Sequence, residues 1–271
     1  MPDLSKMMIA CGLVLAGLGG GWLIASRAPM TNPAPEDSAP TTHGEWVRYA
    51  NAAGDSIRAY VAYPERQGKA PALIVIHEIF GLTDWEQGVV DDYAAKGYVA
   101  IAPDLLSSRF GSTSVLGDTA RQAVGRLSSE GVLADLDATW DYINAQPATD
   151  TGNIGAIGFC WGGGTVWNLA AHNPRLRAAV VCYGPLADTA LLNSVEAPVL
   201  GVYGENDGRV TNALPDIVRK MNELGKSFVA DSYAGTGHGF LKPGRNGHGT
   251  AEAVRAQADI DAFLKRQLER R

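Results

Sequence analysis

The sequence predicts an α/β protein built on a mostly parallel, doubly wound sheet with an antiparallel entry pair of strands. Three observations predict it. Short apolar runs recur along the chain, as expected for strands buried on both faces of a parallel sheet. Helical segments separate most of these runs, and two alternating segments precede them. The runs are residues 71–78, 98–104, 154–159, 178–184, 197–204 and 227–233.

The remaining elements are predicted from hydrophobic periodicity and from glycine and proline residues that typically end helices. Segments 45–50 and 56–64 alternate as antiparallel strands joined around Ala53-Gly54-Asp55. One helix ends at Gly97 and another stops before Pro147. Serine and glycine dominate residues 107–117, which predicts a loop. The expected helices are 84–96, 133–145, one after each of the runs 154–159 and 197–204, and 250–268.

The length, composition and net charge of the chain limit the functions that it can have. The chain has 271 residues, of which 46% are hydrophobic, enough to fill one large core. Its net charge of -6 and the lack of a basic cluster argue against a nucleic-acid partner. We therefore expect a monomer that acts on a small molecule and needs no cofactor.

The first residues differ from the rest. Residues 1–27 contain an uncharged apolar stretch after Lys6, which fits either a signal peptide or an N-terminal membrane anchor. Residues 28–44 are rich in proline and small polar residues and predict a flexible linker before a domain over 45–271. A buried helix at the start is disfavoured by its glycines. The expected location is outside the cytoplasm, periplasmic or membrane-anchored.

The cysteines do not form a disulfide scaffold. The chain has three, and Cys11 lies in the N-terminal apolar segment. Only Cys160 and Cys182 belong to the expected domain, which is too few for a stapled fold. Their pairing is disfavoured, because Cys182 lies within a strand run and Cys160 at a corner.

Chemically active residues follow several of the apolar runs. Cys160, Asp207 and His238 supply a nucleophile, an acid and a histidine in that chain order, each at the end of a different strand. Such ends meet at one edge of a parallel sheet, where sites of α/β proteins form. The alternative is that none of the three is catalytic: Cys160 would be a small buried side chain, Asp207 a turn residue and His238 an exposed loop residue.

The cysteine has a specific sequence context. It lies in Gly158-Phe159-Cys160-Trp161-Gly162, the thiol counterpart of the Gly-x-Ser-x-Gly corner between a strand and a helix. In that geometry the nucleophile is strained and the two glycines crowd together, so neither position tolerates a side chain. The sulfur then faces the N-terminus of the next helix, whose positive end favours thiolate.

Two other kinds of site are excluded. The "HEIFG" stretch would need a second histidine at Gly81 to bind zinc as a helical His-Glu-x-x-His motif does, so no metal is expected. The glycines of "GFCWGGG" also lack the G-x-G-x-x-G spacing of a dinucleotide site.

The motifs "HEIFG", "APDL", "GFCWGGG", "YGENDGRV" and "GTGHGF" together resemble the dienelactone hydrolase (carboxymethylenebutenolidase) family, which has the α/β-hydrolase fold. The resemblance spans about residue 45 to the C-terminus. It implies Cys160 as nucleophile, His238 as base and acid, and Asp207 as the group that orients the histidine. It also implies an oxyanion hole from the backbone N–H groups of Ile79 and Trp161.

The resemblance further implies that Glu78 interacts with the resting thiol and is displaced when substrate binds. A carboxylate beside a thiol raises the thiol pKa, so this would act as a substrate-triggered switch. The expected reaction is hydrolysis of an ester or lactone through a thioester. Two alternatives remain. The first is a cysteine-dependent thioesterase or another carboxylesterase on this fold, and the second is a catalytically silent membrane-anchored binding domain.

Three positions depart from the family pattern. Arg109 lies one position after an arginine that holds the substrate carboxylate in the family, and Lys242 replaces a second arginine. Gly239 stands where the family often has serine. Lysine holds a carboxylate as a point charge and not as a bidentate fork, which puts dienelactone itself in doubt as substrate.

Overall fold

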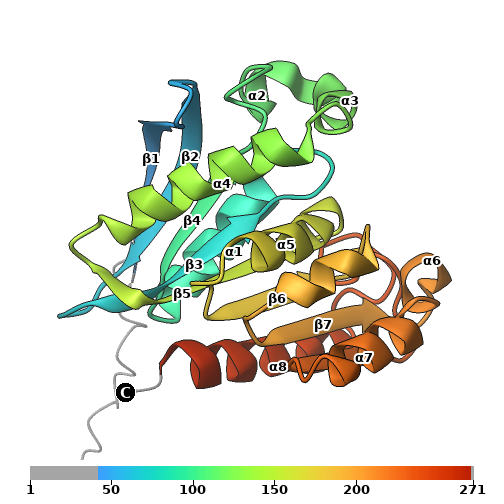
Figure 1. The fold of residues 1–271 in the computed structure, drawn as a ribbon. Coiled ribbons are helices and arrows are strands. Elements are labelled where there is room, and N and C mark those ends of the chain that lie inside the picture. The colour runs from blue at the N-terminus through green and yellow to red at the C-terminus, as the bar shows by residue number, and fades with distance from the viewer. Residues whose placement is uncertain (1–41, 270–271) are drawn as a thin grey trace, which may run out of the picture. The chain divides into compact units, whose positions relative to one another are not determined.

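The sheet has eight strands in the order β1-β2-β4-β3-β5-β6-β7-β8, seen in Figure 1. The computed structural model describes residues 42–269, which belong to one compact unit. β1 (Thr42–Ala50), β2 (Ser56–Pro64) and β4 (Val99–Asp104) pair antiparallel in succession. The other neighbours pair parallel and confirm the predicted fold class. These strands are β3 (Ala70–Ile76), β5 (Thr149–Phe159), β6 (Ala178–Cys182), β7 (Val199–Gly204) and β8 (Phe228–Tyr233).

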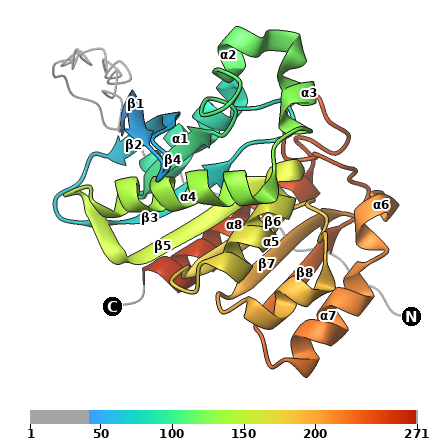
Figure 2. The ribbon, with the colours of Figure 1, turned by 45° about the horizontal axis from the view of Figure 1, so that its top comes forward.

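Helices cover both faces of the sheet. α4 (Ser129–Asn144), α5 (Trp161–His172) and α7 (Leu214–Glu223) pack on one face. α1 (Asp84–Ala95) and α8 (Ala251–Leu268) pack on the other, and Figure 2 shows α8 beyond the strands that α4 and α5 cross. Every residue of β3 is buried, which explains its unbroken apolar sequence.

The helix ends follow local capping chemistry. α4 begins four residues before the predicted start at residue 133, because the Ser128 hydroxyl accepts a hydrogen bond from the Gly131 N–H (3.2 Å). Thr250 caps α8 in the same way. After α1, Gly97 has a φ of 97°, a conformation that favours glycine, so the predicted end of that helix is confirmed.

The predicted loop over 107–117 is wrong in its second half. Residues from Thr113 onward form α2 (Thr113–Leu116), a 3₁₀ turn over 117–119 and α3 (Ala120–Val124). The buried Asp104 carboxylate accepts hydrogen bonds from the Thr113 N–H (2.6 Å) and hydroxyl (2.8 Å). This anchor starts a helix where serine and glycine alone predict none.

The N-terminal predictions lie mostly outside the described residues. The segment over 1–27 and most of the linker over 28–44 fall there. The strand β1 begins inside that linker at Thr42, because residues 42–44 pair with residues 62–64 of β2. No helix within residues 42–269 has the length and apolar character to cross a membrane.

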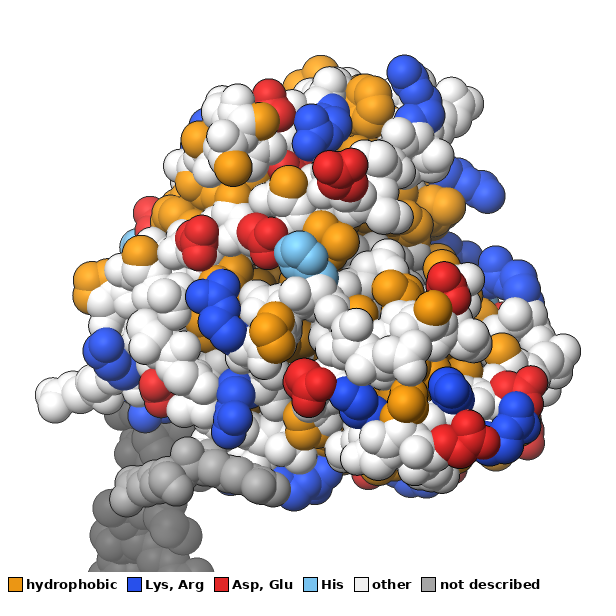
Figure 3. All heavy atoms as spheres, in the orientation of Figure 1, with side chains coloured by type: hydrophobic (Ala, Val, Ile, Leu, Met, Phe, Trp, Pro, Cys, Tyr) orange, Lys and Arg blue, Asp and Glu red, His pale blue; other side chains and the backbone are white. Residues whose placement is uncertain are grey.

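Both signs of charge are mixed on the face in Figure 3, where no broad area is Lys and Arg alone. A short helix, α6 (Gly208–Thr211), and a 3₁₀ segment over 189–194 complete the described elements.

Candidate active site

The corner between β5 and α5 holds Cys160 in a strained conformation. Its φ is 54° and its ψ is -113°, which is uncommon for a residue with a side chain. A Cβ on Gly158 would lie 2.2 Å from the Gly162 carbonyl oxygen, and one on Gly162 would lie 2.3 Å from the Ile76 oxygen. The crowding expected from the two glycines is therefore present, and it fixes where the sulfur points.

The loop after β8 brings His238 to the end of β7. The Asn206 N–H donates to the Thr236 carbonyl (2.9 Å), which ties this loop to the one after β7. Gly204, the last residue of β7, leaves room for the loop, since a Cβ there would lie 2.5 Å from the Gly237 oxygen. The close approach of the two loops positions His238 beside Asp207.

Cys160, His238 and Asp207 form one hydrogen-bonded chain. The His238 Nε2 lies 3.0 Å from the Cys160 Sγ, and its Nδ1 lies 2.5 Å from Asp207 Oδ2. A carboxylate only accepts, so we assign the proton to Nδ1, which leaves Nε2 to accept from the thiol. Asp207 is 6% exposed, and its position after β7 keeps its carboxylate beside the imidazole. The structure thus brings together the three residues that follow separate strands.

The thiol is less acidic than the helix N-terminus alone would make it. Burial raises the pKa of Cys160 above its usual value, and the Glu78 carboxylate raises it further. The Trp161 N–H and the Arg209 guanidinium lower this pKa but do not outweigh burial. The Trp161 N–H at the start of α5 thus acts in the expected direction, but burial and the Glu78 charge outweigh it, because desolvation disfavours the charged form.

Glu78 contacts a lysine and not the thiol. Its Oε2 accepts from Lys242 Nζ (2.9 Å), while the described partner of the Cys160 sulfur is His238. The expected resting contact between Glu78 and the thiol is thus replaced by an ion pair. A nearly fully buried carboxylate requires a cation, and Lys242 supplies it. Glu78 still acts on the thiol through its charge.

Sequence reasoning missed Glu86, which belongs to the same group of charges. Its Oε1 lies 3.9 Å from Lys242 Nζ and accepts from the Glu78 N–H (3.3 Å). The sequence pattern that could have identified Glu86 is Thr83-x-x-Glu86, the pattern of a capping box at the start of a helix. In the structure, both hydrogen bonds of this capping box form at the start of α1.

The family resemblance implied the backbone N–H groups of Ile79 and Trp161 as the oxyanion-hole donors. Trp161 is the first residue of α5, and its N–H hydrogen-bonds to the thiol. The Ile79 N–H has no acceptor among residues 42–269. His77 stabilises both positions: its ring stacks on Trp161 (5.4 Å, 15°) and its Nδ1 donates to the Glu78 carbonyl (2.7 Å). An unpaired N–H beside a nucleophile can stabilise an oxyanion.

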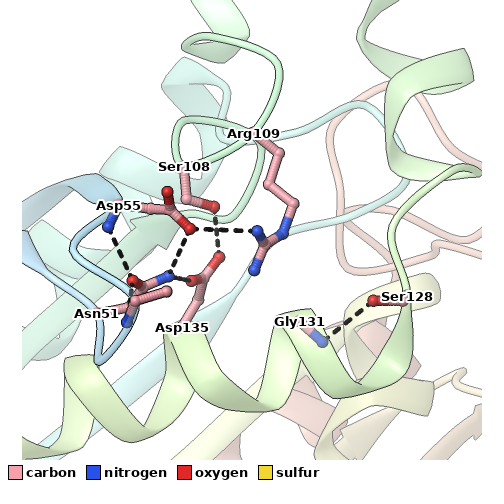
Figure 4. Close-up of polar contacts among 8 residues, drawn as sticks. Asn51, Asp55, Ser108, Arg109, Ser128, Gly131 and Asp135 are labelled. Carbon is pink, nitrogen blue, oxygen red and sulfur yellow. Dashed lines mark hydrogen bonds and ion pairs between the residues drawn. The ribbon is translucent and has the colours of Figure 1, made fainter.

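Arg109, which was expected to hold a substrate carboxylate, forms an ion pair with Asp55. Its Nη1 donates to Asp55 Oδ2 (3.3 Å), and Figure 4 shows the side chain directed toward Asp55 above α4. Asn51 donates to both Asp55 (3.3 Å) and the buried Asp135 (2.8 Å), and Asp135 also accepts from Ser108 (2.6 Å). This network holds Asp55 in the turn between β1 and β2, where its carboxylate pairs with the Arg109 guanidinium.

Tyr183 is a second residue that sequence reasoning missed. It follows β6, and its φ of 42° is, like that of Cys160, rare for a residue with a side chain. Its ring packs edge-on against the His238 ring (5.2 Å between centroids), and its buried hydroxyl has no hydrogen-bond partner among the described residues. The sequence feature that could have identified Tyr183 is its position directly after a buried strand.

The other groups that could react or bind a metal are the second cysteine and the histidine and carboxylate side chains. Cys160 and Cys182 are free thiols, so the disfavoured disulfide is not formed. Within residues 42–269, no three histidine, cysteine, aspartate or glutamate side chains are grouped to hold a metal ion.

Comparisons with known proteins agree on one family. The model of the "Dienelactone hydrolase family" matches residues 57–268. A protein named "Putative carboxymethylenebutenolidase" from Methylorubrum extorquens is 35% identical over 68% of this chain and 68% of its own length. One of the same name from Escherichia coli K12 is 34% identical over 74% of this chain and 79% of its own. The crystal structure of a "Putative Dienelactone Hydrolase" from Klebsiella pneumoniae matches with a TM-score of 0.76 and 28% identity, over 82% of this chain and 98% of that one.

Proposed function

This chain belongs to the dienelactone hydrolase family of carboxylic ester hydrolases, and we propose that it cleaves an ester or lactone with a Cys-His-Asp triad through a thioester. The single observation that carries the proposal is the 3.0 Å contact between Cys160 Sγ and His238 Nε2. A thiol and an imidazole at this distance can exchange a proton directly.

Acylation begins with the thiol proton. His238 Nε2 takes it as the sulfur attacks the carbonyl carbon, and the carbonyl oxygen becomes an oxyanion. The N–H groups of Ile79 and Trp161 stabilise that charge, with a typical value of about 3–4 kcal/mol for each donor. The C–O bond then breaks, the leaving oxygen takes the proton from Nε2, and the acyl group stays on Cys160.

Deacylation repeats these steps with water. His238 Nε2 takes a proton from water as its oxygen attacks the thioester carbonyl. The C–S bond breaks, the acid is released, and the sulfur recovers the proton. Asp207 keeps Nδ1 protonated throughout and stabilises the imidazolium that forms in each step. Burial and the Glu78 charge raise the pKa of Cys160, so proton transfer to His238 assists the attack of the sulfur.

Hydrolysis of 4-nitrophenyl acetate by the wild type, with and without iodoacetamide, tests this proposal. Cys182 is fully buried, and peptide mapping separates alkylation of Cys160 from alkylation of Cys11. The expected result is loss of activity in proportion to alkylation, and slower alkylation in the presence of the ester. Turnover that survives complete alkylation of Cys160 would contradict the proposal.

A further inference from the structure

We infer that this hydrolase acts on esters or lactones whose acyl group is uncharged and apolar, and that it discriminates against a substrate carboxylate. The inference rests on the proposed function and names the substrate class of the same site. Two features carry it. The largely buried cation Lys242 already has carboxylate partners, and apolar side chains adjoin the nucleophile.

The charge group around Lys242 has more carboxylates than cations. Lys242 lies 2.9 Å from Glu78 and 3.9 Å from Glu86, whose side chains are 4% and 0% exposed. The group therefore carries a formal charge of about -1 in surroundings with little solvent. The charge of Glu78 also reaches the Cys160 sulfur, whose pKa it raises. A substrate carboxylate bound here would meet net repulsion.

Lys242 is not easily released to bind a substrate. Glu86 is fixed, since its Oε2 accepts from the Thr83 N–H (2.9 Å) and from the Thr83 hydroxyl. The Lys242 ammonium also lies 4.6 Å from the centre of the Trp85 ring, which favours its present position. If Lys242 turned toward a ligand, two buried carboxylates would lose their cation, and such a loss is strongly unfavourable.

The arginines of this region do not replace it, and Arg245, whose side chain lies beside Gly239, is exposed. Arg109 is paired with Asp55. Arg209, whose charge also reaches the thiol, lies 3.8 Å from Asp207 and is 71% exposed. Water and salt screen an exposed guanidinium, so Arg209 does not offset the buried negative charge.

Apolar side chains adjoin the nucleophile: Cys160 packs against the cluster that contains Phe159 and Leu241, and Trp161 belongs to a second one. The chain between β4 and α4 packs a small apolar cluster around Leu106, Ala120, Ala123 and Val124, and the side chains of both oxyanion-hole residues belong to it. An acyl chain on the sulfur can bury apolar area there, worth about 25 cal/mol per Å². The half-buried members of this cluster are Ile79, Phe110, Leu116, Leu127 and Trp161.

Two esters that differ in one charge test the inference. Ethyl butyrate and monoethyl succinate share a leaving group and have acyl chains of similar length, but only the second carries a carboxylate. An alkyl ester is used because the carboxylate of an aryl succinate would expel the aryloxide without the enzyme. We expect kcat/KM to be at least about tenfold higher for the butyrate. Raising the salt concentration from about 0.05 M to about 0.5 M should reduce this ratio, because salt screens the repulsion.

The variant Glu86→Gln identifies the source of the discrimination. It removes one of the two carboxylates and keeps the side-chain size, so the butyrate-to-succinate ratio should fall by about tenfold. Asp84→Asn is the matched control: it removes a carboxylate from the same turn of α1, but from an exposed side chain without contact to Lys242. Its ratio should equal that of the wild type.

The outcomes separate this inference from the proposed function. Equal or better use of the succinate by the wild type overturns the inference alone and leaves the hydrolase proposal standing. A ratio that responds neither to Glu86→Gln nor to salt also overturns it. If neither ester is cleaved, the proposed function fails first, and the inference that rests on it fails with it.

Discussion

His238 lies between Cys160 and Asp207, with its Nε2 3.0 Å from the sulfur and its Nδ1 2.5 Å from the carboxylate. Replacing it as His238→Gln should lower kcat/KM for 4-nitrophenyl acetate by about 10²–10⁴-fold, because within residues 42–269 no other side chain is hydrogen-bonded to the sulfur and could take its proton. His248→Gln is the control, since that exposed histidine lies in the following loop. Equal losses in the two variants would contradict the assigned role.

Asp207 should act through the histidine. In Asp207→Asn the amide no longer favours a proton on Nδ1, so Nε2 loses its role as acceptor, and kcat should fall by about 10³–10⁴-fold. The KM should change little, because the carboxylate lies behind the imidazole. Steady-state kinetics measure both values. A rise in KM with unchanged kcat would indicate a role in binding instead.

The corner glycine Gly162 should be irreplaceable for steric reasons. A Cβ there would lie 2.3 Å from the Ile76 oxygen and 2.5 Å from the His77 oxygen, so Gly162→Ala should cost about 3 kcal/mol in the free energy of unfolding or prevent folding. Gly88→Ala in α1 is the matched control. A Cβ at Gly88 meets nothing within 4 Å, so this change should stabilise the protein by about 0.5–1 kcal/mol. Urea denaturation measures both, and similar values for the two would refute the steric argument.

The charge of Glu78 should be visible in the reactivity of the thiol. Burial and then Glu78 raise the pKa of Cys160, so Glu78→Gln removes a cause of the increase and should lower that pKa. The rate of alkylation by iodoacetamide reports thiolate, so its midpoint should move to lower pH in the variant. Asp84→Asn should leave the midpoint in place. An unchanged or higher midpoint in Glu78→Gln would show that its carboxylate does not act on the sulfur.

Arg109 should have no part in selecting the acyl group. Its guanidinium is paired with Asp55, so Arg109→Gln should leave the butyrate-to-succinate ratio unchanged. The pair is partly exposed, and its loss should cost no more than about 1 kcal/mol of stability. Kinetics with the two esters and urea denaturation check these values. A selective loss of succinate hydrolysis would show that the arginine binds the carboxylate after all.

Much of the fold and three residues of the site followed from local sequence rules. Parallel strands bring their carboxyl ends to one edge, so Cys160, Asp207 and His238 were expected to meet, and they do. The pairing of Lys242 with Glu78 was not expected. It depends on how the loop after β8 lies against the start of α1, and no periodicity encodes that contact.

The other differences have the same origin. The helix at Thr113 depends on the buried Asp104, and the position of Arg109 depends on Asp55 in the turn between β1 and β2. Asp104 lies nine residues before Thr113, and Asp55 lies 54 residues before Arg109. Composition indicated a loop rich in serine and glycine there, but it could not indicate which carboxylates its residues would contact.

The measurement that tests the central claim most directly is intact-protein mass spectrometry after rapid acid quench of the enzyme with 4-nitrophenyl butyrate. A thioester intermediate predicts a transient mass increase of one butyryl group, assigned by peptide mapping to Cys160 and lost with hydroxylamine. It should be absent from Cys160→Ala, which should also lack turnover. Full turnover in Cys160→Ala, or acylation at another residue in the wild type, would contradict the account.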